Sequence, residues 1–392
     1  MNNNFFALTR YLRDRGIDAH LLLLNNEISH FHPSQDTFDL DYQEYTHTVS
    51  WGDPFSFLDF SGKEIDRDIK DYDYIIACDV VPAFLMKIDR PVNIFVPFGS
   101  DLYYYPFMRL VKHPNKQLNY YYCSKNQRIG IQQAEYMSLT PTNNEFKNVI
   151  ERIKYPGKIL NFGVPMIYTP LFNPETIQLF YDRSHWRGEF EKLRNKSDLL
   201  IFHHSRHFWK KGNNGFAYKA NNYLIEGFAR FIRQYPSIKA CLIMLEYGPD
   251  VQETKKLVKK LNITSYVKWF PLMARKDLMV GINHSDIVAG EFGHSWLVYG
   301  VVYEAMAMGK PILHHRQDKY YQDIYPELYP MIHAKNIEDI FYAFQKYANE
   351  KEYFQKIGLA GKDWLQKYLI DQTVERYVEL ILGKSLIGSH KF

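Results

Sequence analysis

The sequence predicts an α/β protein of two domains, each built on a parallel β-sheet. Short apolar runs typical of strands recur along the chain and alternate with amphipathic stretches typical of helices, as in parallel strands joined by helical crossovers. The 392 residues suffice for two cores at roughly 100–200 residues per domain. The amino-acid composition changes at Tyr168–Pro174, a segment with two prolines that precedes a predicted charged helix over Trp186–Lys196. We take this change to mark the connection between the domains.

The expected elements give the domain limits. We predict an N-terminal domain over residues 1–175, a second domain over 176–371, and a last helix over 372–392 that returns to the first domain. Helices are expected at Asn222–Gln234, Val251–Leu261, Tyr303–Met308 and Val374–Leu382. Strands are expected at His20–Leu24, Tyr74–Ala77, Val92–Val96, Leu199–His203, Lys239–Leu245, Val267–Phe270, Ile287–Ala289 and Pro311–Leu313.

The start of the chain departs from this pattern. A doubly wound domain usually opens with a strand that leads through a turn into a helix. Here Met1 is followed at once by NNNFFALTRYLRDRG, which reads as a turn and a helix, and the next strand is His20–Leu24. Either the start codon is misplaced or the domain lacks its usual first strand.

Composition narrows the cellular setting. Cys78, Cys123 and Cys241 share no metal-like spacing and cannot all pair within one chain, which favours a reducing compartment. The longest purely aliphatic run, Leu21–Leu24, is far too short to cross a bilayer, and the N-terminus has no signal-peptide core. We therefore expect a cytoplasmic protein, at most peripheral on the inner face of the plasma membrane, with no bound metal.

Charge is distributed unevenly along a chain whose net charge is +4. Residues 102–134 contain no acidic side chain, and tyrosines lie among their basic ones. Such a stretch suits an anionic partner, for example a membrane surface or a lipid-linked acceptor. The alternative is that the tyrosines pack inward and the cations are simply solvated. No nucleic-acid-binding motif accompanies the stretch, so nucleic acid is not expected. Its basic residues are Arg109, Lys112, Lys116, Lys125 and Arg128.

Basic residues follow the predicted strand Leu199–His203. Arg206 and Lys211, five residues apart, would both project into a cleft at the end of the strand, where a guanidinium and an ammonium together suit a diphosphate. A solvated basic loop is the alternative. The nearby histidines at 203, 204 and 207 lack supporting carboxylates, and a metal site is therefore not expected.

Two later segments carry further candidate residues. Gly248, in the sequence EYGPD after a strand, permits the chain to turn beneath a bound base or phosphate. Glu304 lies in GVVYEAMAMGKPIL, where a carboxylate inside an otherwise apolar helix is costly to bury without partners. Ribose hydroxyls would be such partners, and a surface position is the alternative.

The order and spacing of these segments resemble the C-terminal domain of GT-B glycosyltransferases, in particular the retaining family 4. Ser205–Arg206 with Lys211–Gly212 is similar to the first family element except for its glycine, and YGPD at 247–250 is similar to the second. EAMAMGKPI from Glu304 matches the second half of the third element. The resemblance implies a GT-B fold, with two Rossmann-like domains across a cleft and a C-terminal helix that crosses back to the first.

The resemblance also implies roles for individual residues. Arg206 and Lys211 would hold the diphosphate and stabilise the leaving group, Glu304 would bind the ribose, and Gly248 would lie near the base. Trp296 stands where the family has its first glutamate, so contact with the donor sugar passes to Glu291. Further donor-site residues are expected in the loop and at the aromatic–glycine pair before the helix, namely His294, Tyr299 and Gly300.

The N-terminal domain matches the family less closely. VPFGSDL at 96–102 resembles the family segment that faces the sugar, although Phe98 replaces a common histidine. Asp101 is therefore the candidate catalytic residue of this domain, and an N-cap is the alternative for it. Residues expected to line the cleft are Asn3, Asn4, Gly99, Ser100 and Gly163.

Together these features predict transfer of a sugar from a nucleotide-diphosphate donor to a hydroxyl of a glycan or lipid-linked glycan, as in polysaccharide biosynthesis. Retention of anomeric configuration and independence from metal are implied by the resemblance alone, and no cofactor is expected besides the donor. A sugar-nucleotide epimerase, or a non-catalytic carbohydrate- or membrane-binding scaffold on the same fold, remains the alternative.

Overall fold

The computed structural model describes residues 3–25, 28–112, 114–139, 144–210 and 217–383. The chain divides into two compact units, and each is described by itself. Of the described residues, those up to Pro33, from Asp39 to Pro165 and from Thr373 onward form unit 1. Unit 2 consists of Ser34–Phe38 and Met166–Gln372. The main division thus lies after residue 165, ahead of the expected limit at 175, and the last helix groups with unit 1.

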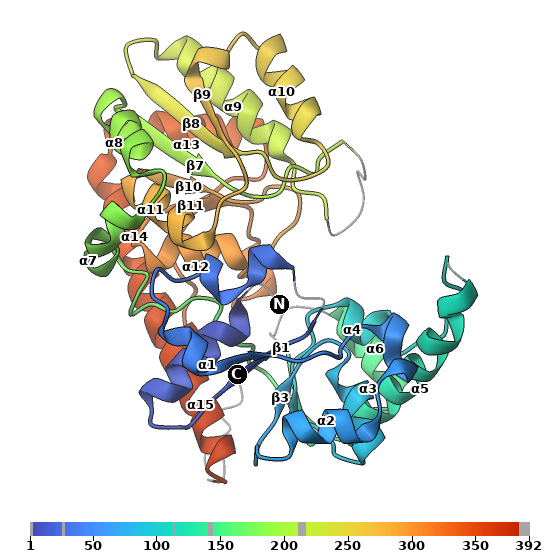
Figure 1. Ribbon diagram of the computed structural model, residues 1–392. Coiled ribbons are helices and arrows are strands. Elements are labelled where there is room, and N and C mark those ends of the chain that lie inside the picture. The colour runs from blue at the N-terminus through green and yellow to red at the C-terminus, as the bar shows by residue number, and fades with distance from the viewer. Residues whose placement is uncertain (1–2, 26–27, 113, 140–143, 211–216, 384–392) are drawn as a thin grey trace. The chain divides into compact units, whose positions relative to one another are not determined.

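Unit 2 is built on a six-stranded parallel sheet with the order β12-β11-β10-β7-β8-β9 (Figure 1). The chain enters the sheet at β7, continues through β8 to the edge strand β9, returns to β10 beside β7, and proceeds through β11 to β12. The strand order therefore reverses between β7 and β10. The strands are β7 (Leu199–His203), β8 (Ala240–Leu245), β9 (Val267–Phe270), β10 (Ile287–Ala289), β11 (Ile312–His314) and β12 (Ile332–His333).

Helices cover both faces of this sheet. Leu199 and Ile201 of β7 belong to a core cluster with apolar residues of α9 and α13. Phe202 points the other way, because side chains alternate along a strand, and its ring lies 6.1 Å from that of Phe190 in α8. The helices are α7 (Pro174–Ile177), α8 (Arg187–Lys196), α9 (Asn221–Gln234), α10 (Val251–Lys260), α11 (Arg275–His284), α12 (Gly300–Ala307), α13 (Ile337–Asn349) and α14 (Lys351–Trp364).

Unit 1 contains a four-stranded parallel sheet, β3-β4-β5-β6, and a separate parallel pair, β1-β2. Helix α1 precedes β1, and no strand comes before it in the part of the chain that the structure describes. The strands are β1 (Leu21–Leu23), β2 (Thr46–Thr48), β3 (Ile76–Ala77), β4 (Ile94–Phe95), β5 (Tyr136–Ser138) and β6 (Lys158–Leu160). The helices are α1 (Asn4–Asp14), α2 (Gly62–Ile69), α3 (Val81–Leu85), α4 (Ser100–Tyr103), α5 (Gln117–Gln133), α6 (Asn144–Ile153) and α15 (Gln372–Ile381).

The C-terminal helix is long. Helix α14 continues through a π-helical turn, Leu365–Asp371, into α15. Within unit 1, the buried Tyr377 of α15 donates its hydroxyl to the carbonyl of Gly163 at 3.1 Å, and its ring meets Phe162 edge-on at 5.3 Å. These contacts attach α15 to the end of β6.

Candidate functional site

The candidate site lies at the carboxyl edge of the unit 2 sheet, where the strand order reverses. In open α/β sheets, ligands bind outside the carboxyl ends of the strands at such a reversal. The residues that follow β7 include His204 and Arg206, and those that follow β10 include Glu291. Because β7 pairs directly with β10, the two loops start side by side.

A buried histidine joins these two loops. Asn221 Nδ2 donates to His203 Nε2 at 2.9 Å, so Nδ1 carries the proton and donates to the carbonyl of Ala289 at the end of β10, also at 2.9 Å. The other amide atom of Asn221, Oδ1, accepts from the N–H of Phe208 at 3.0 Å. Burial lowers the pKa of His203 to about 3, so the imidazole is neutral. His203 is therefore a structural link and not a metal ligand.

The loop after β7 rests on the turn after β8. The N–H of His207 donates to the carbonyl of Tyr247 at 2.7 Å, and the N–H of Asp250 donates back to His207 O at 3.1 Å. Gly248 lies between them with φ +115°, and a Cβ there would come within 2.5 Å of His207 O. The structure thus gives Gly248 a packing reason to be glycine, whereas its predicted proximity to a nucleobase stays a prediction.

The same loop is anchored to α10 as far as residue 210. The backbone N–H groups of Trp209 and Lys210 both donate to Asp250 Oδ2 at 2.8 Å, and Trp209 Nε1 donates to Thr254 Oγ1 at 2.9 Å. Arg206 lies on the exposed side of this anchored loop. Lys211, the predicted second cation of the clamp, and Gly212 lie outside the described residues.

Glu291 is buried beside a lysine that the sequence did not single out. Its side chain is only 8% exposed, and Oε2 accepts from Lys219 Nζ at 2.6 Å. Burial raises the pKa of Glu291, and the charges of Lys219 and Arg206 oppose that rise. Arg206 therefore acts electrostatically on Glu291 from the neighbouring loop. Lys219 is 72 residues distant from Glu291 in sequence, so no local motif signals this pair.

The backbone around Glu291 is fixed by the start of α12. The N–H of Glu291 donates to the Tyr299 hydroxyl at 2.8 Å, and its carbonyl accepts from the N–H of His315 at 3.0 Å. A Cβ on Gly290 would come within 2.2 Å of the Tyr299 hydroxyl oxygen, so a glycine is required there. Tyr299 is the N-cap residue of α12, no side chain caps this end, and a Cβ on Gly300 would meet open space. The first N–H groups of an uncapped helix favour an anion.

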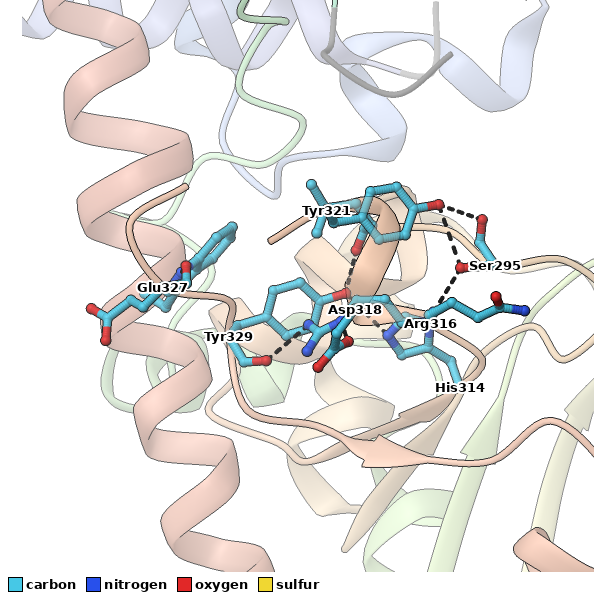
Figure 2. A network of polar contacts seen from close by, with 10 residues as sticks. Ser295, His314, Arg316, Asp318, Tyr321, Glu327 and Tyr329 are labelled. Atoms are coloured by element: carbon cyan, nitrogen blue, oxygen red, sulfur yellow. Dashed lines mark hydrogen bonds and ion pairs between the residues drawn. The ribbon is translucent and has the colours of Figure 1, made fainter. Parts of the chain in front are cut away.

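The loop between Glu291 and Tyr299 is held in place by the segment after β11 (Figure 2). Tyr321 donates its hydroxyl to the carbonyl of Ser295 at 2.6 Å, and Ser295 Oγ accepts from the N–H of Gln317 at 2.8 Å. Tyr329 donates its hydroxyl to Leu297 O, and Arg316 Nη1 donates to Tyr329 O at 2.8 Å. This network fixes the loop independently of any ligand. Next to it, the ring of His294 lies 6.1 Å from that of Trp296.

Glu304 has protein partners for both of its carboxylate oxygens. It accepts from His204 Nε2 at 2.7 Å and from Arg275 Nε at 3.0 Å. Arg275 also donates to the carbonyl of Met166 at 3.0 Å and pairs with Asp36 at 3.3 Å. Burial alone would raise the pKa of Glu304, but the bond from His204 and the charge of Arg275 hold it below its ordinary value. A carboxylate can accept about four hydrogen bonds, so these two protein partners leave Glu304 able to accept from ribose hydroxyls as well. Ribose binding by Glu304 stays a prediction.

In unit 1, Asp101 serves its own loop. Its side chain is fully buried, and it accepts from the backbone N–H groups of Gly99 at 2.8 Å, Phe98 at 3.1 Å and Asp79 at 3.1 Å. Burial raises the pKa of Asp101 to about 7. Gly99, not Asp101, is the N-cap residue of α4, which begins at Ser100. With its carboxylate facing inward, Asp101 is placed to shape the loop, and its predicted direct contact with a sugar stays a prediction.

The other residues predicted to line a cleft occupy two further places in unit 1. Asn3 is the N-cap residue of α1 with φ 62°, and Asn4 is the first residue of that helix; both side chains are buried. Gly163 follows β6 and accepts from Tyr377. Among the hydrogen bonds of the described residues, none links Asn3, Asn4 or Gly163 to the loop of Asp101.

Comparison with solved structures identifies the fold. HepE from Anabaena, solved in complex with UDP-glucose, superposes with a TM-score of 0.60 at 13% identity and covers 97% of this chain and 95% of its own. WaaG, a glycosyltransferase involved in lipopolysaccharide biosynthesis, superposes at 0.53 with 13% identity and the same coverage. A glycosyltransferase from Rickettsia africae ESF-5 gives 0.58 at 14% identity, covering 99% and 95%.

The chain has the GT-B fold. At these identities the likeness concerns the fold alone, and the predicted α/β class is confirmed. No family model and no curated protein matches the sequence. None of the described helices combines the length and apolar composition needed to cross a bilayer.

Proposed function

We propose that this protein is a glycosyltransferase that takes a sugar from a nucleoside-diphosphate donor and transfers it to a hydroxyl acceptor. The observation that carries the proposal is the strand reversal in unit 2, where Arg206, Lys219 and Glu291 lie close to the uncapped start of α12. Cations and helix N–H groups suit a diphosphate, and a fixed carboxylate suits sugar hydroxyls.

The proposed division of labour follows from this placement. Arg206, with Lys211 as predicted from the sequence, binds the diphosphate and stabilises the negative charge that develops on it when the glycosidic bond breaks. Glu291, oriented by Lys219, accepts hydrogen bonds from the donor sugar. Retention of configuration and transfer without a metal are carried over from the family resemblance. No group of three or more histidine, cysteine or acidic side chains among the described residues has the arrangement of a metal site.

Donor binding is the first test. We would measure the melting temperature of the wild type with a panel of UDP-, GDP-, ADP- and TDP-sugars, and repeat it with Arg206→Ala. Arg230→Ala is the matched control, because Arg230 lies half exposed on α9, where it pairs with Glu338 at 3.8 Å and its guanidinium lies 4.3 Å above the Phe341 ring. At least one donor should stabilise the wild type and the control, by about 2.7 kcal/mol at 100 times Kd. Arg206→Ala should lose most of that gain, and a wild type that no donor stabilises would contradict the proposal.

Turnover then separates the alternatives. A glycosyltransferase releases nucleoside diphosphate in proportion to the glycan acceptor added. An epimerase isomerises the donor without acceptor, and a scaffold binds a donor without consuming it. Proton NMR of the glycoside formed reports whether the anomeric configuration is retained.

The acceptor side of the proposal rests on residues 102–134, where the structure exposes apolar and basic side chains together. Tyr120 is buried and donates its hydroxyl to the carbonyl of Phe107 at 3.2 Å, so the inward-packing alternative holds for that tyrosine. Leu110, by contrast, is 92% exposed. The exposed side chains of this basic apolar surface are Met108, Leu110, Leu118, Tyr121 and Tyr122, with the lysines 112, 116 and 125.

We propose that this surface contacts an anionic membrane that carries the acceptor. Arg128 is poorly suited to test it, because its guanidinium donates to the carbonyl of Pro106 at 2.8 Å. Reversal of Lys112, Lys116 and Lys125 to glutamate should abolish co-sedimentation with vesicles of one-third phosphatidylglycerol, at roughly 1 kcal/mol per cation. Reversal of three exposed lysines of unit 2, Lys256, Lys259 and Lys260, is the control. Equal sedimentation of the wild type and both variants would refute the membrane contact.

A further inference from the structure

Unit 1 contains a cavity of about 640 Å³ between its two separate pieces of sheet. Its walls include both β1 and β3, together with residues of α1, Trp51 and Ile381. Pockets of several hundred Å³ with mainly apolar walls are the usual places where proteins bind a further group, so a pocket of this size suits an occupant. We call this cavity the slot.

The slot is bounded by two unpaired strand edges. Strand β1 pairs with β2 on one side, and β3 pairs with β4 on one side; neither has a second neighbour among the described strands. The bonds Leu21 N–H to Tyr45 O and Val96 N–H to Ala77 O show which residues face those partners. Backbone groups alternate between the two edges of a strand, so those of Leu22, Leu24 and Ile76 point into the slot.

The connectivity indicates what belongs there. Helix α1 leads directly into β1, which lies in a parallel pair. A helix in this position normally forms the crossover from a preceding parallel strand that neighbours the next one. With a strand in the slot, the two-stranded and four-stranded pieces would become one continuous parallel sheet.

The ends of the slot fit a strand that runs into α1. Since α1 ends near the start of β1, its first residues lie at the other end, where β1 and β3 finish. Asn3 lines the slot there, is 8% exposed, and its Oδ1 has no hydrogen-bond partner among the described residues. The opposite end is lined by Asp18, Asp71 and Asp73, which favours a basic entry.

We propose that the slot binds one β-strand of about five apolar residues, parallel to β1 and β3, supplied by polypeptide that precedes Met1 in the full-length protein. Five residues at about 3.3 Å each match the length of wall from His20 to Leu24. One or two basic residues before the strand would meet the acidic end, and a short turn would join it to α1. The strand joins the two pieces of sheet in unit 1 and removes two unpaired sheet edges.

The test compares four chains by melting temperature and amide exchange. The first begins at Met1, and the second adds the in-frame codons found upstream of Met1 in the gene. The third adds a designed segment of two lysines, five alternating valines and isoleucines, and a glycine–asparagine turn. The fourth is the third with prolines at the second and fourth strand positions, which removes the ladder N–H groups.

The natural and designed extensions should each raise the melting temperature by several degrees and slow exchange at Leu22 and Ile76, whereas the proline control should do neither. If the chain that begins at Met1 precipitates, the second and fourth chains are compared instead, by their soluble yield and by their amide hydrogen exchange. A designed strand that stabilises while the natural extension does not, or a stop codon directly ahead of Met1, overturns the proposed source. Equal behaviour of all four chains overturns the strand site itself.

Discussion

Arg275 holds two buried carboxylates in unit 2, and its replacement by methionine should be strongly destabilising. The Arg275 side chain is 12% exposed, Glu304 is 9% and Asp36 is 0%. Methionine keeps most of the apolar volume but removes the charge and the bonds to Glu304, Asp36 and Met166 O. Loss of one member of a buried ion pair costs roughly 3–5 kcal/mol, because the remaining charges stay buried without compensation. At about 2–4 °C per kcal/mol for a domain of this size, the melting temperature should fall by about 10 °C.

Urea unfolding followed by circular dichroism measures this loss, with Arg230→Met as the matched control. Arg230 pairs with Glu338 at 3.8 Å, and both side chains are about half exposed, so its replacement should change the free energy of unfolding by about 0–1 kcal/mol. The penalty of Arg275→Met should also shrink as the pH becomes acidic, because protonation then neutralises the Glu304 carboxylate, whose pKa the charge of Arg275 helps to hold down. A loss within about 1 kcal/mol of the control, or one independent of pH, would refute the reasoning.

Three further predictions concern the loops of the site. Because the pKa of His203 is lowered from 6.5 to about 3, the free energy of unfolding should be highest above pH 6.5 and should fall by about 4–5 kcal/mol as the pH drops toward 3. His203→Gln should flatten this acidic decline in a plot of stability against pH. An unchanged decline would show that His203 does not cause it. Gly248→Ala should cost about 2–4 kcal/mol through strain and the clash with His207 O, whereas Gly188→Ala in α8, where a Cβ meets nothing, should be neutral or slightly stabilising in the same melts. Lys219→Met should raise the pKa of Glu291 and destabilise unit 2 by about 2–3 kcal/mol, with a larger loss at higher pH, where Glu291 is ionised. The variant should also bind the donor more weakly than Lys255→Met, the control, whose lysine pairs with Glu246 at the surface. Equal donor affinity of the two variants would exclude a role for Lys219 in the site.

The sequence by itself determined the fold class and most of the strands. Leu199–His203, Val267–Phe270 and Ile287–Ala289 are strands with the predicted bounds. For Leu199–His203 and Ile287–Ala289 the reason is a continuous apolar run, which is a local signal of a strand buried on both faces. The strands β2, β5, β6 and β12 were not predicted. Thr46–Thr48 and Lys158–Leu160 are short and partly exposed, so their sequences carry little such signal.

Sequence also located the loops of the candidate site, but the partners of its charged residues were decided by tertiary structure. Glu304 was expected to need partners; that they are His204 and Arg275 follows from the packing of α12 against the loop after β7 and against α11. Lys219 meets Glu291 because β10 lies beside β7. Such pairs depend on the order of strands in the sheet, which non-local packing sets and which no local pattern encodes. The start of the chain illustrates both contributions. The sequence indicated that the usual strand before α1 is missing, and the tertiary structure shows the slot between β1 and β3 where such a strand fits.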